Sequence, residues 1–174
     1  MIKKLYFEYF MNIHLTKTRF STTTKPIEQS VDTLLTDGNP EPFFKVVETI
    51  LKEHHSNRDE IAYAEKHLQT LIIGLLCPYE SYFIHSEYES ARTYPDIFLE
   101  RLANGPIEFD IVFELKYVKK KDEAQLESIV EEAKIQLDGY MKSKRFDRPD
   151  MRGFYVVYFS GEVYKWAEWT KVIA

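Results

Sequence analysis

Residues 107–118 read IEFDIVFELKYV, and the middle of this segment is apolar on both faces of the strand that it predicts. Because side chains alternate along a strand, Glu114 and Lys116 share one face with Val112 and Val118. A strand of this kind is typical of the buried centre of a sheet, where an unpaired charge is costly. Two interpretations stay open: a mutually satisfied ion pair at a strand end, or a metal ligand beside a catalytic lysine.

A second carboxylate precedes an apolar run in the segment YPDIFLERL, residues 94–102. The turn-forming sequence ANGP, residues 103–106, predicts that this strand and the strand at 107–118 are antiparallel neighbours. Asp96 would then approach Glu114, and two carboxylates in a partly buried site repel each other unless a divalent cation lies between them. Taken alone, Asp96 also fits an ordinary strand-start residue after Pro95.

Hydrophobic periodicity predicts an α/β fold with a mixed central sheet and helices on both of its faces. Three strands at 80–89, 94–102 and 107–118 follow a helical region, and a long helix at 123–143 comes next. The remaining predicted elements are helices at 3–15, 27–35, 43–54 and 59–76, and strands at 153–159 and 162–166. The order is therefore helix, three strands, helix, two strands.

Composition limits the classes of function. The chain has 174 residues, of which 44% are hydrophobic, enough for one domain with a short appendage. A net charge of −5 argues against a basic, nonspecific DNA-coating protein. The single cysteine excludes an internal disulfide, and the longest apolar run is far too short to span a bilayer. We therefore expect a cytoplasmic protein that does not enter the membrane.

The two acidic segments combine into a spaced motif. Pro95-Asp96 and Glu114-Leu115-Lys116 read PD followed by ExK, and 114 − 96 = 18. This pattern resembles the PD-(D/E)XK nuclease superfamily, whose restriction-endonuclease-like core has the element order αβββαβ. The segments TDGNPEPFFKVVETILKEH, RTYPDIFLE, FELKYVKKK and EEAKIQLDGY are similar to one bacterial subfamily. In that subfamily the nuclease domain follows an AAA-ATPase-like domain.

The resemblance assigns roles to particular residues. It implies that Asp96 and Glu114 bind Mg²⁺ or Mn²⁺, and that Lys116 acts at the scissile phosphate. Glu65 matches a further acidic residue on the first core helix, and it also fits a first-turn glutamate that the helix dipole favours. Gln136 and Tyr140 match a Q-x3-Y signature. The resemblance places Gln136 near the site or substrate, and Tyr140 is a candidate for substrate contact that also fits core packing.

Three basic residues are further candidates for substrate contact. Arg92 precedes the PD motif, where related sequences often carry a Gly-Arg pair, and Ala91 replaces the glycine here. Lys119 and Lys120 directly follow the strand that carries Glu114. A lysine run of this kind can hold a phosphate backbone, although it also fits a solvated loop.

The resemblance predicts two segments, an N-terminal helical remnant at 1–30 and a nuclease-like domain at 31–174. It implies a magnesium-dependent phosphodiesterase that hydrolyses DNA or RNA, and an ATPase-like partner domain. The alternative is a nuclease-fold module that lost its ATPase-like partner, has weak or no catalytic activity, and serves regulation or nucleic-acid binding.

Overall fold

The computed structural model describes residues 23–55, 65–86, 95–103 and 105–170. The chain divides into two compact units: residues 1–80 with 161–163, and residues 81–160 with 164–174. The predicted helix at 3–15 lies outside the described residues. The predicted division of the chain at residue 30 stays a prediction.

The described part of the first unit up to residue 80 is mainly helical. Its helices are α2 (Lys25–Asp37), α3 (Glu41–His55) and α4 (Glu65–Leu76). Pro26 lies in the first turn of α2, where a missing N–H is harmless, and the helix ends at Gly38 with a φ of 68°. Asn39 Oδ1 accepts a 3.1 Å hydrogen bond from the Glu41 N–H and so caps α3. The helices predicted at 27–35, 43–54 and 59–76 are confirmed in their described residues.

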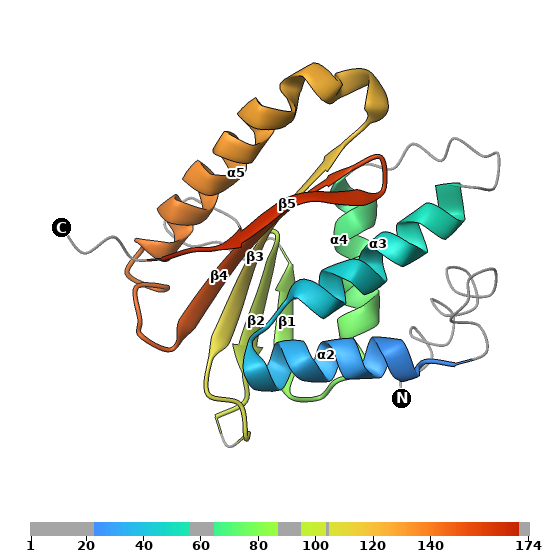
Figure 1. Cartoon of the computed structure of the whole chain (residues 1–174). Coiled ribbons are helices and arrows are strands. Elements are labelled where there is room, and N and C mark those ends of the chain that lie inside the picture. Colours follow the sequence, from blue (N-terminus) through green and yellow to red (C-terminus); the bar gives the residue numbers. More distant parts are fainter. Residues whose placement is uncertain (1–22, 56–64, 87–94, 104, 171–174) are drawn as a thin grey trace. The chain divides into compact units, whose positions relative to one another are not determined.

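A five-stranded mixed sheet dominates the second unit (Figure 1). Its strands are β1 (Tyr82–Ser86), β2 (Ile97–Arg101), β3 (Asp110–Val118), β4 (Met151–Phe159) and β5 (Glu162–Glu168), in that spatial order. β1 pairs antiparallel with β2, β2 antiparallel with β3, and β3 parallel with β4. The strand that the sequence predicts to be buried, β3, is therefore the central strand. It is shorter than the predicted 107–118, because it begins only at Asp110.

Helix α5 (Leu126–Met141) connects the parallel strands β3 and β4 and packs on one face of both (Figure 1). The core under this helix contains Val112 and Val118 of β3, which share their face with Glu114 and Lys116. The approach is close at Gly153, where a Cβ would lie 2.7 Å from Met141 Sδ. A 3₁₀ helix, Lys120–Gln125, precedes α5 and includes the first residues of the long helix predicted at 123–143.

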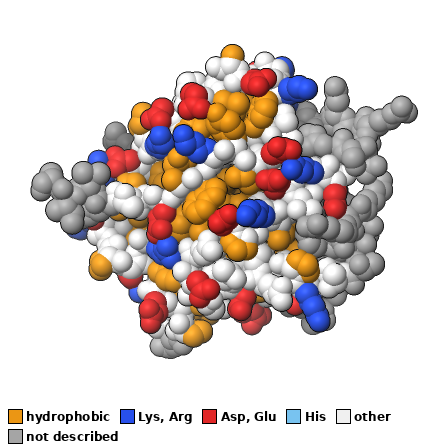
Figure 2. Space-filling view, in the orientation of Figure 1, with side chains coloured by type: hydrophobic (Ala, Val, Ile, Leu, Met, Phe, Trp, Pro, Cys, Tyr) orange, Lys and Arg blue, Asp and Glu red, His pale blue; other side chains and the backbone are white. Residues whose placement is uncertain are grey.

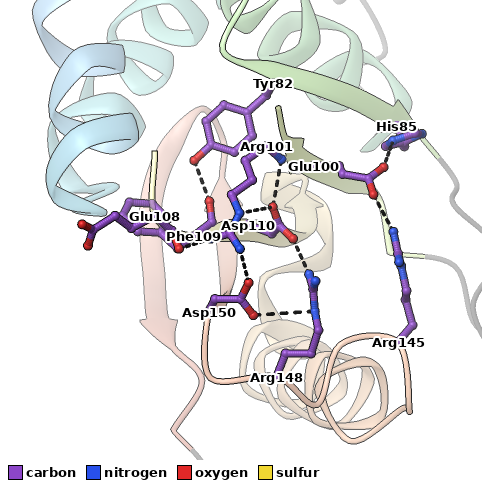
Figure 3. Close-up of polar contacts among 10 residues, drawn as sticks. All are labelled: Tyr82, His85, Glu100, Arg101, Glu108, Phe109, Asp110, Arg145, Arg148 and Asp150. Atoms are coloured by element: carbon purple, nitrogen blue, oxygen red, sulfur yellow. Dashed lines mark hydrogen bonds and ion pairs between the residues drawn. The ribbon is translucent and has the colours of Figure 1, made fainter. Parts of the chain in front are cut away.

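A network of charged side chains fixes the start of β3 (Figure 3). Asp110 is only 3% exposed, and its Oδ1 accepts a 2.8 Å hydrogen bond from the Arg101 N–H at the end of β2. Its Oδ2 accepts a hydrogen bond from the Arg148 guanidinium. Both arginines also pair with Asp150, just before β4. The network therefore joins β2, β3 and the approach to β4 at one end of the sheet.

The order α4-β1-β2-β3-α5-β4 is the predicted αβββαβ order, and the α/β fold class is confirmed. It agrees with a restriction-endonuclease-like core. Within the described residues, no helix combines the length and apolarity needed to span a bilayer.

Candidate active site

Asp96 lies directly before β2 and reaches across to β3. Its Oδ2 accepts a 2.7 Å hydrogen bond from the Leu115 N–H. Ile97 pairs with Phe113 in the antiparallel register, so continuing that register by one residue places Asp96 opposite Glu114. The predicted antiparallel pairing of the two strands is confirmed, and it brings the two acidic motif residues to the same point of the sheet.

Glu114 lies in the middle of β3 and is 2% exposed. Among the described residues, no hydrogen-bond donor reaches its Oε2 atom, which is buried. A buried carboxylate oxygen without a donor is uncommon, because the lost hydration is not replaced. This oxygen can therefore accept a further proton or cation.

Lys116 extends on the same face and meets Glu114. Its Nζ lies 2.8 Å from Glu114 Oε1 and 4.0 Å from Glu132 Oε1 of α5. The lysine side chain is 12% exposed, so the ammonium lies at the rim of the buried region rather than in open solvent. The ion pair that the first interpretation of the sequence requires is present, and it does not exclude a catalytic role.

Three residues of α5 at four-residue spacing, Glu132, Gln136 and Tyr140, form a polar stripe on one side of that helix. Gln136 Nε2 donates a 3.4 Å hydrogen bond to Glu132 Oε1, and its own Oε1 is buried without a donor among the described residues. Tyr140 is 6% exposed, belongs to the core, and hydrogen-bonds to Glu114. The stripe thus contacts both Glu114 and Lys116 of β3.

Burial raises the pKa of the Glu114 carboxyl from 4.5 to about 7. The negative charge of Asp96 acts in the same direction. The hydrogen bond and positive charge of Lys116 oppose the rise in pKa, as does the hydrogen bond from Tyr140, but they do not cancel it. Desolvation therefore outweighs the lysine, and Glu114 is held close to the point at which it exchanges a proton at neutral pH.

This raised pKa predicts a pH-dependent stability in metal-free buffer. Between pH 4.5 and about 7 the folded protein binds more protons at Glu114 than the unfolded chain does. The protonated Glu114 therefore favours the folded state below pH 4.5, and this contribution to stability is lost as the pH rises through about 7. From pH 5 to pH 8 we expect Glu114 to cost roughly 2–3 kcal/mol of unfolding free energy. Urea unfolding with EDTA should show this decline in the wild type and in Glu123→Gln, and a flatter profile in Glu114→Gln. Parallel profiles for the wild type and Glu114→Gln would contradict the raised pKa.

The remaining predicted residues have different positions. Glu65 is half-buried at the start of α4, in the first unit. Arg92 lies outside the described residues. Lys119 is half-buried and Lys120 is exposed directly after β3, and neither forms an ion pair with a described residue. Whether these four residues belong to the site stays a prediction.

The donor set suits one kind of metal ion. Within the described ranges, no cluster of three or more His, Cys, Asp and Glu side chains is arranged to hold a metal. Two converging carboxylates remain, Asp96 and Glu114, and one of their oxygens is buried without a donor. Mg²⁺ prefers oxygen ligands, and it is commonly held by one or two carboxylates, with waters and substrate phosphates completing its shell. The residues present therefore fit a magnesium-like ion and do not fit zinc.

A family model described as the PD-(D/E)XK nuclease superfamily matches residues 63–169. The chain belongs to the PD-(D/E)XK nuclease superfamily. A search of curated proteins found no match. Membership of this superfamily supports a nuclease-type function with a nucleic acid as substrate, and its members generally use divalent metal ions.

The sequence of this PD-(D/E)XK superfamily member did not lead us to predict two contacts in its candidate site. Glu132 was not considered, although it lies four residues before Gln136 and so falls on the same side of a helix as the predicted signature. Tyr140 was assigned to packing or weak substrate contact, and it also hydrogen-bonds to Glu114. The four-residue spacing was the available signal for Glu132. No signal in the sequence pointed to the hydroxyl contact of Tyr140.

Proposed function

We propose that this protein is a metal-dependent nuclease that hydrolyses phosphodiester bonds of DNA or RNA. Asp96 and Glu114 would hold Mg²⁺ or Mn²⁺, and Lys116 would lie at the scissile phosphate. The observation that carries this proposal is the convergence of Asp96, directly before β2, and Glu114 on the adjacent strand β3, beside a lysine that is largely buried. Superfamily membership supports the same chemistry.

Each residue of the site has a separate task in this proposal. A bound divalent cation would supply Lewis-acid polarisation of the phosphate and lower the pKa of a bound water. Asp96 and Glu114 would hold this cation where the phosphate binds. The Leu115 N–H keeps the Asp96 carboxylate in place. The Lys116 ammonium stabilises the negative charge that develops on the phosphate oxygens in the transition state.

Charge distribution supports an approach of substrate at the end of β3. Figure 2 shows basic and acidic side chains interspersed among the described residues of the face that it presents, without a large basic area. The cations at the opposite end of β3 are already paired, since Arg145 contacts Glu100 and Arg148 contacts Asp110. The lysines at 119–121, by contrast, pair with no described carboxylate. They would contact the phosphate backbone and contribute affinity without sequence specificity.

Three further expectations from the sequence belong to the proposal. An ATPase-like partner domain rests on the resemblance of the segments at 36–54 and 131–140. Roles for Glu65 as a metal ligand and for Arg92 in substrate contact rest on the resemblance as well. So does the contact of Gln136 with the site or substrate, which its buried amide oxygen supports.

The proposal is tested by cleavage assays on single-stranded and duplex DNA and RNA, with Mg²⁺, with Mn²⁺ and with EDTA. We expect cleavage only with metal, and a loss of roughly 10²-fold or more in Glu114→Gln. Glu123→Gln, an exposed acidic residue on the 3₁₀ helix, is the matched control and should keep full activity. Equal cleavage by Glu114→Gln would identify a contaminating nuclease. Nucleic-acid binding without any metal-dependent cleavage would favour the non-catalytic module instead.

A further inference from the structure

Lys116 lies between two carboxylates that come from different elements. Its Nζ is 2.8 Å from Glu114 Oε1 on β3 and 4.0 Å from Glu132 Oε1 on α5. The nearer carboxylate is 2% exposed and the farther one is 58% exposed. These two carboxylates therefore give the ammonium a close, buried partner and a more distant, solvated partner within a short movement of its flexible side chain.

The Glu132 contact is of little use for stability. An ion pair at 4.0 Å with one exposed partner contributes little to the free energy of unfolding, because water screens that partner. Glu132 is nevertheless fixed in direction, since Gln136 Nε2 donates a hydrogen bond to the same oxygen that faces Lys116. This arrangement holds a carboxylate beside the ammonium at a contact that adds little to the stability of the fold.

Metal binding at Glu114 would compete with the ion pair. In the proposed function, a divalent cation at Glu114 Oε2 and the Lys116 ammonium at Oε1 would share the one negative charge of this carboxylate. Two positive charges that share one buried carboxylate repel each other strongly, because the surroundings screen them poorly. The ammonium must then move away from Glu114, and it needs another negative partner to remain in the site.

We propose that Glu132 receives the Lys116 ammonium from Glu114 when a divalent cation binds; this inference rests on the proposed function. Glu132 is then a positioning residue, because it acts through Lys116 and does not bind the metal. The exchange keeps the ammonium beside the site, where it can meet the phosphate, and it removes a competing cation from Glu114. Gln136 holds Glu132 in the receiving orientation through its 3.4 Å hydrogen bond.

A double-mutant cycle read out by metal binding tests this exchange. Isothermal titration calorimetry with Mn²⁺ would compare the wild type, Glu132→Gln, Lys116→Met and the double variant, with no nucleic acid present. Without the receiving carboxylate, Lys116 stays on Glu114, so Glu132→Gln should weaken Mn²⁺ binding roughly 3- to 30-fold. In the Lys116→Met background, the same substitution should change the dissociation constant less than about twofold.

Glu131→Gln is the matched control. Glu131 is the neighbouring residue on α5, is similarly exposed at 62%, and pairs with Lys134 instead. It loses the same charge without facing Lys116, so its Mn²⁺ affinity should equal that of the wild type. The double variant separates the exchange from a simple field effect of Glu132, because a field effect weakens binding whether or not Lys116 is present.

The outcomes distinguish this inference from the function on which it rests. Mn²⁺ binding by the wild type with no weakening in Glu132→Gln, or with equal weakening in both backgrounds, would overturn the exchange and leave the metal site intact. A wild type that binds no Mn²⁺ would overturn the proposed metal site and the exchange together.

Discussion

Lys116→Met is expected to fold, to bind a divalent cation, and to lose cleavage activity by a factor of about 10²–10³. Methionine keeps most of the side-chain volume and removes the charge that would stabilise the developing phosphate charge. One such donor in a preorganised site accounts for a loss of this size. Single-turnover cleavage with saturating Mg²⁺ would measure it, beside calorimetry of metal binding.

The fold should tolerate Lys116→Met because of the state of Glu114. Its pKa is already about 7, so removing the ammonium causes the carboxyl to take up a proton rather than remain as an unpaired buried charge. We therefore expect a loss of unfolding free energy of about 1–2 kcal/mol at pH 7. Removing one partner of a buried ion pair whose other group stays charged would cost roughly 3–5 kcal/mol of unfolding free energy.

Lys134→Met is the control for this change. Lys134 lies on α5, is 40% exposed, and pairs with Glu131. Its replacement should leave both cleavage and stability unchanged, since an exposed pair contributes little. A Lys116→Met protein that keeps its cleavage rate would refute the role of Lys116. A large fall in stability, in a protein whose parent shows no metal-dependent cleavage, would leave the pair with a purely structural role.

Asp110→Ala should markedly lower the stability of the second unit. The change removes the acceptor for the Arg101 N–H and for the Arg148 guanidinium (Figure 3). Breaking a wholly buried pair costs roughly 3–5 kcal/mol. Both arginine side chains are about a third exposed and keep Asp150 as a partner, so we expect a smaller loss, about 2–3 kcal/mol.

Urea unfolding at neutral pH would measure the Asp110 effect, and Glu108→Gln serves as its control. Glu108 is exposed two residues earlier, and its backbone carbonyl, not its carboxylate, accepts the hydrogen bond from Arg101. Metal-dependent cleavage well below the unfolding temperature should survive in Asp110→Ala, because Glu114 lies four residues further along β3. Wild-type stability in Asp110→Ala would show that the network adds nothing to the fold.

The order of elements could be predicted because local patterns agreed with the tertiary structure. The apolar run around Phe113 predicted a central strand, and the periodicity around Leu137 predicted the helix that covers it. Strand ends were less predictable. Ile107 to Phe109 continue the apolar alternation, yet β3 starts at Asp110, where the arginine network holds the chain.

The candidate site was predictable only where its signal lay in sequence spacing. The PD and ExK motifs identified Asp96, Glu114 and Lys116, and their juxtaposition followed from two antiparallel strands. The raised pKa of Glu114 could not be predicted, because it depends on how completely α5 and the sheet exclude water. The contact between Lys116 and Glu132 also depends on how α5 is rotated over β3, which a sequence pattern does not determine.

The central claim is that Asp96 and Glu114 hold one divalent cation. The most direct test is an anomalous difference map from crystals grown with Mn²⁺. We predict a single strong peak that lies within about 2–2.5 Å of an oxygen from each carboxylate, and that disappears in Glu114→Gln. A wild-type map without a peak between Asp96 and Glu114 at saturating Mn²⁺, or with a peak that Glu114→Gln leaves in place, would contradict the account.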